Sequence, residues 1–146
     1  MADDLAWLAA RGEPRLLAEI VATVELERAL AAAGFDVRLA ARAVDDVLLG
    51  ARVVLVTRDS ATIAIAEPST EGRLAASLAR SGEGVVGRYL AAAVDLDTIR
   101  RLAAGAGVAL SRREVGPFGP EVLVATTPAA GPHLLLVDAR TVPSPG

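Results

Sequence analysis

The sequence predicts an α+β fold in which two tandem βαβββ modules form a curved eight-stranded sheet around a cleft, preceded by a short helix. Two observations carry this prediction. Stretches rich in β-branched residues alternate with stretches of helical spacing, and the same order occurs in both halves. The letters also repeat, because TVELER at residues 23–28 matches AVDLDT at residues 93–98. Modules this short cannot each bury a sheet face alone, so we expect them to pair.

The first half contains the N-terminal helix and module one. Residues 2–11 have the spacing of a short amphipathic helix, and Gly12 and Pro14 punctuate its end. Module one, at about residues 17–68, follows. Its expected elements are a strand over 17–24, a helix from Leu26 to a stop at Gly34, and strands over 37–43, 52–57 and 62–66, with turns at Asp45-Asp46, Gly50 and residues 58–60.

A helical connector joins the modules within what we take to be one domain over residues 1–146. Leu74 and Leu78 lie at i,i+4, Thr70 is a candidate N-cap, and Gly82 follows the last helical residue of the segment 70–82. Module two, at about residues 84–138, repeats the order of module one. Its expected elements are a strand over 89–94, a helix over 96–104 that stops at Gly105 and Gly107, and strands over 108–111, 121–125 and 133–137.

Composition excludes several functional classes. Of 146 residues, 53% are apolar and 23% charged, which is typical of a globular protein. The net charge is -3 and the 15 arginines are scattered among acidic residues, so we expect no nucleic-acid partner. Cysteine and lysine are absent, which excludes thiolate and Schiff-base chemistry. The acidic N-terminus and the lack of a long apolar run predict a cytoplasmic protein without a membrane partner.

The segment between the modules carries a family resemblance. Glu67-Pro68, then Ser69-Thr70-Glu71, the connector and Gly82-Glu83-Gly84 follow one another in order. This order, with the repeat, resembles the vicinal oxygen chelate superfamily, which includes glyoxalases, fosfomycin and bleomycin resistance proteins and methylmalonyl-CoA epimerase. The epimerase is the most similar of these, and the resemblance covers about residues 17–138. It implies two modules around a cleft and a homodimer.

The resemblance also implies four metal-ligand positions at the floor of the cleft, which this chain fills with poor ligands. Counting from Gly84 would move one of them from Tyr89 to Gly87. Alanine and leucine offer a divalent ion no electron pair, and a neutral tyrosine is a weak ligand. We therefore expect no metal and no other cofactor. The four positions are Glu19, Ala64, Tyr89 and Leu135.

Three side chains near these positions are candidates for acid/base catalysis. Strand alternation would point Glu19, Tyr89 and His133 into one concavity from three strands. Histidine titrates near neutral pH, apolar walls raise the pKa of a carboxyl, and a tyrosine hydroxyl can donate to a developing enolate oxygen. Each residue also has a structural interpretation: His133 as a strand cap, Glu19 as a partner of Arg15, and Tyr89 as packing.

Six further residues are expected to bind ligand. Thr23 and Thr62 share strand faces with ligand positions, and Phe118 lies in an expected mobile hairpin over residues 115–120 at the cleft edge. Two arginines share a face of the strand expected over 37–43, where they either anchor an anion or contact solvent. The six residues are Thr23, Arg38, Arg42, Thr62, Phe118 and Leu135.

These features predict a metal-independent isomerase, epimerase or cyclase that acts on a carbonyl-containing small molecule by acid/base proton transfer. The alanine- and arginine-rich composition indicates a GC-rich bacterial genome, for which specialised metabolism is the expected setting. The alternative is a non-catalytic protein that sequesters an acyl-thioester or natural product, as the resistance members of the superfamily do. A third option is a degenerate partner subunit, which would have a closed and filled cleft.

Overall fold

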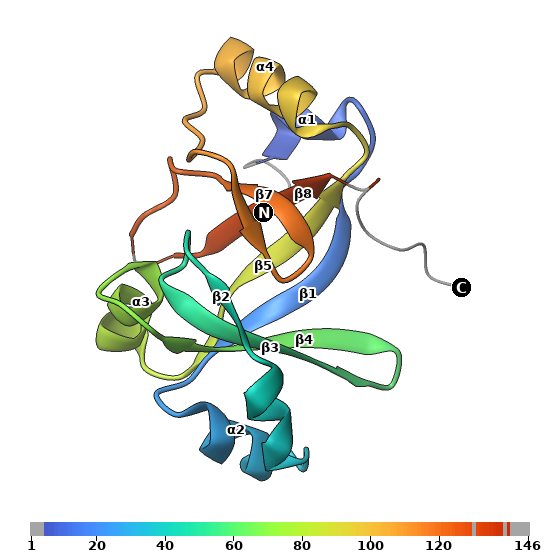
Figure 1. Ribbon diagram of the computed structural model, residues 1–146. Coiled ribbons are helices and arrows are strands. Elements are labelled where there is room, and N and C mark those ends of the chain that lie inside the picture. Colours follow the sequence, from blue (N-terminus) through green and yellow to red (C-terminus); the bar gives the residue numbers. More distant parts are fainter. Residues whose placement is uncertain (1–4, 130, 139, 141–146) are drawn as a thin grey trace.

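A computed structural model describes residues 5–129, 131–138 and 140, and it contains a strongly curved eight-stranded sheet (Figure 1). Residues 2–4 of the expected first helix lie outside the described residues. The strands are β1 (Arg15–Ala22), β2 (Val44–Asp46), β3 (Ala51–Arg58), β4 (Ala61–Pro68), β5 (Gly84–Ala92), β6 (Glu114–Gly116), β7 (Gly119–Leu123) and β8 (His133–Asp138). The helices are α1 (Ala6–Ala9), α2 (Leu26–Ala32), the 3-10 helix η2 (Val37–Arg42), α3 (Arg73–Ser81) and α4 (Leu96–Ala106).

The strand order β2-β3-β4-β1-β5-β8-β7-β6 places four strands of each half side by side. The halves meet at the antiparallel pair β1–β5. Within each half, the first strand pairs in parallel with the last, β1 with β4 and β5 with β8. The α+β class and the curved eight-stranded sheet are therefore confirmed, and the two halves repeat one topology.

Apolar side chains form one cluster on the concave face of the sheet and two on its outer face. Alternation along each strand divides them, since Leu135 faces inward whereas Leu134 and Leu136 face outward. The outer clusters lie under α2 and η2 in the first half and under α1 and α4 in the second. The concave cluster consists of Ala18, Ile20, Ala22, Leu49, Ala51, Val53, Ala64, Ala66, Leu74, Val86, Tyr89, Leu123 and Leu135.

Helix α3 lies across one end of the concave face. Its buried Leu74 belongs to the concave cluster, and the Leu74 backbone N–H donates to the carbonyl of Leu49 at 3.0 Å. The helix ends at Gly82, whose positive φ of 74° suits glycine. Its N-cap is Gly72 without a side-chain hydrogen bond, so the prediction of Thr70 as N-cap is wrong.

Two predicted strands are wrong. The segment expected as a strand over 37–43 contains the 3-10 helix η2, which the Asp36 side chain caps by accepting the backbone N–H of Arg38. The strand β2 follows at Val44–Asp46, where the Asp45-Asp46 turn was expected. Over 108–111 there is only an isolated bridge between Leu110 and Val124, and the strand lies at Glu114–Gly116.

Other boundaries differ less. Strand β5 begins at Gly84, five residues before its expected start, and α4 runs through Gly105 to end at Gly107. The expected turn over 58–60 joins β3 to β4. In the described part of the chain, no helix is both long and apolar enough to cross a bilayer.

Candidate active site

A cluster of three fully buried polar side chains interrupts the apolar concave face. It consists of Asp46 at the end of β2, Tyr89 in β5 and Glu121 in β7, and we call it the acid cluster. The Tyr89 hydroxyl donates a hydrogen bond of 2.6 Å to Oδ2 of Asp46. The other oxygen of Asp46, Oδ1, accepts the backbone N–H groups of Leu48 at 3.1 Å and Leu49 at 3.2 Å. Asp46 is thus held in place by three donors.

Glu121 is the unsatisfied member of the acid cluster. Both of its carboxyl oxygens are buried and have no hydrogen-bond partner among the described residues. Burial, together with the negative charges of Asp46 and Glu114, raises the pKa of Glu121 to about 10, although Asp46 and Glu121 make no hydrogen bond of ordinary geometry. At neutral pH Glu121 therefore holds a proton that it donates to no partner in this structure.

Tyr89 also keeps its proton. Burial raises its pKa well above the ordinary value, and the charges of Asp46 and Glu121 act in the same direction. The ring of Phe118, at the turn of the β6–β7 hairpin, packs on the Tyr89 ring with centroids 5.3 Å apart and planes tilted by 58°. The hairpin predicted over 115–120 is thus present. Phe118 covers Tyr89, and the mobility of the hairpin stays a prediction.

His133 lies at the α3 end of the concave face. Its Nε2 is 2.7 Å from the hydroxyl oxygen of the buried Ser77, and its buried Nδ1 has no partner among the described residues. Burial lowers the pKa of His133 to about 4, and the positive charge of Arg73 lowers it too, so the ring is neutral at pH 7. Its contact is with α3, not with the acid cluster.

Glu19 does not share this face, so its prediction as a cleft residue is wrong. Its neighbours Ala18 and Ile20 belong to the concave cluster, whereas Glu19 is exposed and lies opposite Arg88. A shift of one residue in a strand moves a side chain to the other face of the sheet. Ala18, not Glu19, pairs with Tyr89.

The structure places the six predicted ligand-binding residues in different surroundings. Leu135 is fully buried in the concave cluster. Thr62 lies at the far end of β4, where its hydroxyl is 3.4 Å from that of Thr57. Arg38 and Arg42 lie on η2 and not on a strand; Arg38 is exposed and pairs with Asp36 at 2.7 Å.

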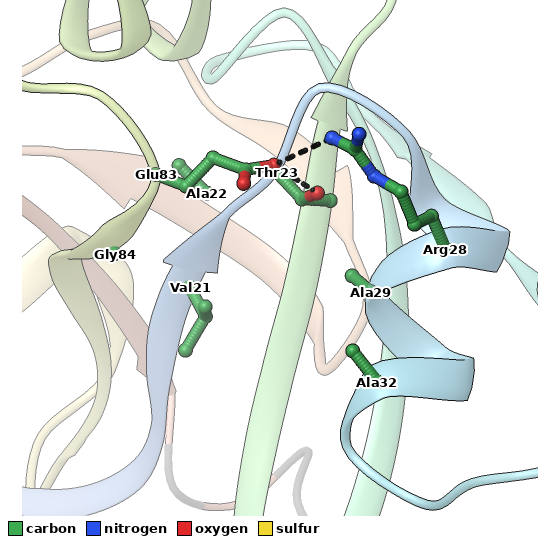
Figure 2. Close-up of a pocket in the computed structure, with 8 residues that line it drawn as sticks. All are labelled: Val21, Ala22, Thr23, Arg28, Ala29, Ala32, Glu83 and Gly84. Atoms are coloured by element: carbon green, nitrogen blue, oxygen red, sulfur yellow. Dashed lines mark hydrogen bonds and ion pairs between the residues drawn. The ribbon is translucent and has the colours of Figure 1, made fainter.

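Thr23 lies beside a separate cavity of about 400 Å³, on the outer side of the sheet between β1 and α2 (Figure 2). Figure 2 shows Val21, Ala29 and Ala32 around the space, with the polar groups at one end. The Thr23 hydroxyl donates to Oε2 of Glu83 at 2.7 Å, and Arg28 approaches the same oxygen at 3.5 Å. These contacts fasten the start of β5 to the end of β1, outside the concave face.

The donor set of the concave face does not fit a divalent metal. Ala64 and Leu135, two of the predicted ligand positions, lie on the concave face, and so does Ala18, the neighbour of the predicted position Glu19; none of these three side chains has a donor atom. Asp46 already accepts three hydrogen bonds, which leaves the Glu121 carboxyl as the only free group of the acid cluster. One carboxyl cannot replace the water shell of such an ion. The described residues contain no group of three or more His, Cys, Asp or Glu side chains arranged as ligands.

Sequence reasoning missed Asp46, Glu121 and Ser77. Asp46 lay in a segment interpreted as a turn. The available signal was the alternation in the strand expected over 121–125, because Glu121 shares a face with Leu123, which pairs with Leu135. That signal places a carboxyl on the concave face, two residues along the strand from the partner of Leu135.

No protein-family model and no curated protein matches the chain. Solved structures do. A crystal structure of methylmalonyl-CoA epimerase from Mycobacterium tuberculosis is similar with a TM-score of 0.68 and 20% identity, over 90% of this chain and 89% of that chain. A variant of Streptomyces coelicolor methylmalonyl-CoA epimerase in complex with 2-nitronate-propionyl-CoA gives a TM-score of 0.65 and 21% identity, over 90% and 98%.

A hypothetical protein from Bacillus halodurans is also similar, with a TM-score of 0.59 and 14% identity over 86% of this chain and 94% of that chain. At these identities the likeness concerns the fold. Together with the paired halves and the concave face, it shows that the chain adopts the vicinal oxygen chelate fold, in the arrangement seen in methylmalonyl-CoA epimerases.

Proposed function

We propose that this protein is an isomerase of the epimerase type that moves a proton at the carbon next to a carbonyl group, without a metal ion. The observation that carries the proposal is the buried, protonated and unpartnered carboxyl of Glu121 beside the Tyr89–Asp46 hydrogen bond. Such a carboxyl among apolar side chains costs stability, and active sites are where proteins retain groups of this kind. The substrate would be a small carbonyl compound or an acyl-thioester.

The three members of the acid cluster have complementary roles in this reaction. Asp46, held by three donors, accepts the proton from the carbon next to the carbonyl. Glu121 offers its O–H group to the carbonyl oxygen as negative charge develops there, while Tyr89, whose one O–H is donated to Asp46, holds that base in place. Once the planar enolate has turned its other face toward Asp46, return of the proton from Asp46 to that face completes an epimerisation, and return to another atom completes an isomerisation.

The proposal requires the β6–β7 hairpin to move, because all three members of the acid cluster are fully buried. Phe118 lies on Tyr89, and the backbone of Gly116 packs against the Glu121 carboxyl. An outward movement of the turn around Phe118 alone, with Glu121 held in place by the pairing of β7 with β8, would open a space lined by the three groups. His133 and Ser77 would then position the closed end of the site without touching the substrate, and Glu19 would have no part.

One observation favours a second candidate, a partner subunit that binds no small ligand. The concave face is filled by its own side chains, with Tyr89 and Leu135 fully buried and Phe118 packed on them. A filled core alone gives no reason for a glutamate without a hydrogen-bond partner. We therefore place this candidate second, and the sequestering protein is distinguished from the enzyme by whether the bound compound is recovered unchanged.

The biological setting we propose is specialised metabolism in the cytoplasm, with the chain acting as a homodimer. Support for the setting comes from the composition and from the ligand positions that lack donor atoms. Support for the dimer comes from the resemblance to a superfamily whose members pair modules across chains. Light scattering on the purified protein measures the oligomeric state directly.

Hydrogen exchange at carbon tests the reaction. The protein is incubated in D2O with propionyl-CoA, methylmalonyl-CoA, a 2-methyl-3-oxo ester or straight-chain oxo acids, and NMR follows loss of the proton next to the carbonyl. We expect exchange with at least one compound, and Glu121→Gln should slow it about 100-fold or more. Glu19→Gln, on the outer face, is the matched control and should leave the rate unchanged. The proposal would be overturned if none of these compounds exchanged its proton. It would also be overturned if Glu19→Gln slowed the exchange while Glu121→Gln did not.

A further inference from the structure

A second cavity, of about 240 Å³, opens at the turn of the β6–β7 hairpin. Its volume equals about eight water molecules at liquid density, enough for a short chain of carbon atoms. One wall comes from η2, β2 and β3, and the other from the hairpin turn. The lining includes Leu39, Arg42, Val44, Val53, Leu55 and Pro117.

This cavity lies against the hairpin turn that covers the acid cluster, although no side chain of the acid cluster lines it. Val53 belongs to the concave cluster and Leu55 packs against it, whereas Leu39 and Val54 belong with an outer cluster, so the cavity lies at the edge of the sheet and reaches the concave face on one side. The opposite wall is Pro117, whose chain neighbour Phe118 covers Tyr89. A molecule that enlarges this cavity therefore pushes on the same turn that hides Tyr89 and Glu121.

Among the described residues that line this cavity, Arg42 alone is charged. It is exposed and forms no ion pair within the described part of the chain. Other arginines nearby are engaged: Arg38 pairs with Asp36, and Arg52 pairs with Glu67 at 2.7 Å. The planar guanidinium of Arg42 is thus available at the rim of an apolar cavity, where it can accept a carboxylate in a two-point contact.

We propose that this cavity is the mouth of the active site and that it selects carbonyl compounds carrying a carboxylate. The carboxylate binds Arg42 at the rim, the carbon chain lies between Leu55 and Pro117, and the carbonyl group reaches Tyr89 and Glu121 once Phe118 turns away. This inference rests on the proposed proton transfer at the acid cluster and adds the class of substrate to it.

Equilibrium binding tests the selection without requiring turnover. Isothermal titration calorimetry compares levulinate and its longer straight-chain homologues with their neutral amides. We expect the carboxylates to bind about tenfold more tightly than the amides, and Arg42→Gln to abolish that preference. Arg38→Gln is the matched control, because it removes a charge from the same short helix away from this cavity. An equal preference in wild type and Arg42→Gln would overturn the inference.

Two further variants separate this inference from the proposed reaction. Val44→Trp fills the cavity at a half-exposed position, so it should fold normally and weaken binding of carboxylate and amide alike by about tenfold or more. If its affinities match wild type, the cavity is not the mouth. Glu121→Gln should retain the Arg42-dependent preference while losing exchange at carbon. If the wild-type protein prefers carboxylates but exchanges no proton at carbon, only the proposed reaction is refuted. If it exchanges the proton at a rate that Arg42→Gln does not change, only the assignment of the cavity as the mouth of the site is refuted.

Discussion

At Glu121 the protein keeps a protonated carboxyl opposite Val137 and on the same face as Leu123. A neutral carboxyl without a partner costs stability in such surroundings. Because the unfolded chain exposes the group to water, its pKa there returns to the ordinary value of 4.5. This difference between the two states makes Glu121 measurable in stability experiments, independently of any ligand.

The first prediction concerns the pH dependence of stability. Between pH 4.5 and about 10 the folded state holds a proton on Glu121 that the unfolded state has released, so the free energy of unfolding falls as pH rises. The slope from one group is at most ~1.4 kcal/mol per pH unit. Glu121→Gln should remove this contribution, and urea unfolding of both proteins across the range measures it. Parallel curves for the two proteins would contradict the raised pKa.

The second prediction concerns the Tyr89–Asp46 hydrogen bond. Tyr89→Phe keeps the ring packing on Phe118 but leaves Oδ2 of Asp46 buried without its donor. We expect the free energy of unfolding to fall by about 1–3 kcal/mol, measured by urea titration at neutral pH. The double variant Tyr89→Phe with Asp46→Asn should lose less than the sum of the single variants. Strict additivity would show that the two groups do not act as a pair.

For individual residues, the sequence correctly predicted Tyr89 and Leu135 on the concave face but misplaced Glu19. Register irregularities in the β1–β5 pair, between Leu16 and Ala18 and between Ile20 and Val21, are not visible in the letters. A count from one motif can therefore be wrong by one residue, which is enough to reverse a side chain. Contacts between distant strands, such as Asp46 with Tyr89, depend on how the whole sheet curls.

The β6–β7 hairpin is the element on which the proposed site depends. It contributes Glu121, places Phe118 on Tyr89, and brings the backbone of Gly116 against the Glu121 carboxyl. A Cβ atom at Gly116 would overlap with that carboxyl, so the hairpin and the acid cluster are packed as one unit.

The third prediction is a double-mutant cycle on this hairpin. Gly116→Ala should lower the free energy of unfolding by about 1–3 kcal/mol, because the added methyl group displaces the Glu121 carboxyl. In an Glu121→Ala background the carboxyl is absent and the same substitution should cost much less. Urea unfolding of the four proteins gives the coupling energy. A coupling near zero would show that Gly116 and Glu121 are independent.

Elements with a strong local signal were predicted well, and η2 was not. Leu26 and Leu30, or Leu74 and Leu78, mark one face of a helix, and those helices are present. The letters VRLAARA fit a period of two or of three equally well, so alternation alone could not reject a strand. The Asp36 side chain favours the 3-10 helix over a strand, because it accepts the Arg38 N–H and starts a 3-10 turn.

At the scale of the whole molecule, the repeat predicted the architecture. A similar six-residue stretch in each half, with two identical residues and two Glu/Asp exchanges, implied that both have one topology, and β1–β4 and β5–β8 are the same parallel pairing. What the repeat could not predict is how fully side chains occupy the space between the halves. That depends on Tyr89, Phe118 and the leucines packing in three dimensions.

The fourth prediction concerns metal. Since Ala64 and Leu135, two of the predicted ligand positions, and the inward-facing Ala18 offer no donor atoms, removal of divalent ions should change neither the Tm nor the exchange rate. Elemental analysis of untagged protein, before and after dialysis against a chelator, is the companion measurement. One tightly held transition ion per chain would refute the metal-free mechanism.

Helix α3 limits how a small molecule can enter and leave the concave face. Leu74 of this helix is packed in the concave cluster and Ser77 contacts His133, so α3 covers one end of the concave face. A compound that enters beside the β6–β7 hairpin therefore has to leave through the same opening. Under the proposed reaction, substrate and product would share this one opening, and the expected pattern of product inhibition is competition with substrate.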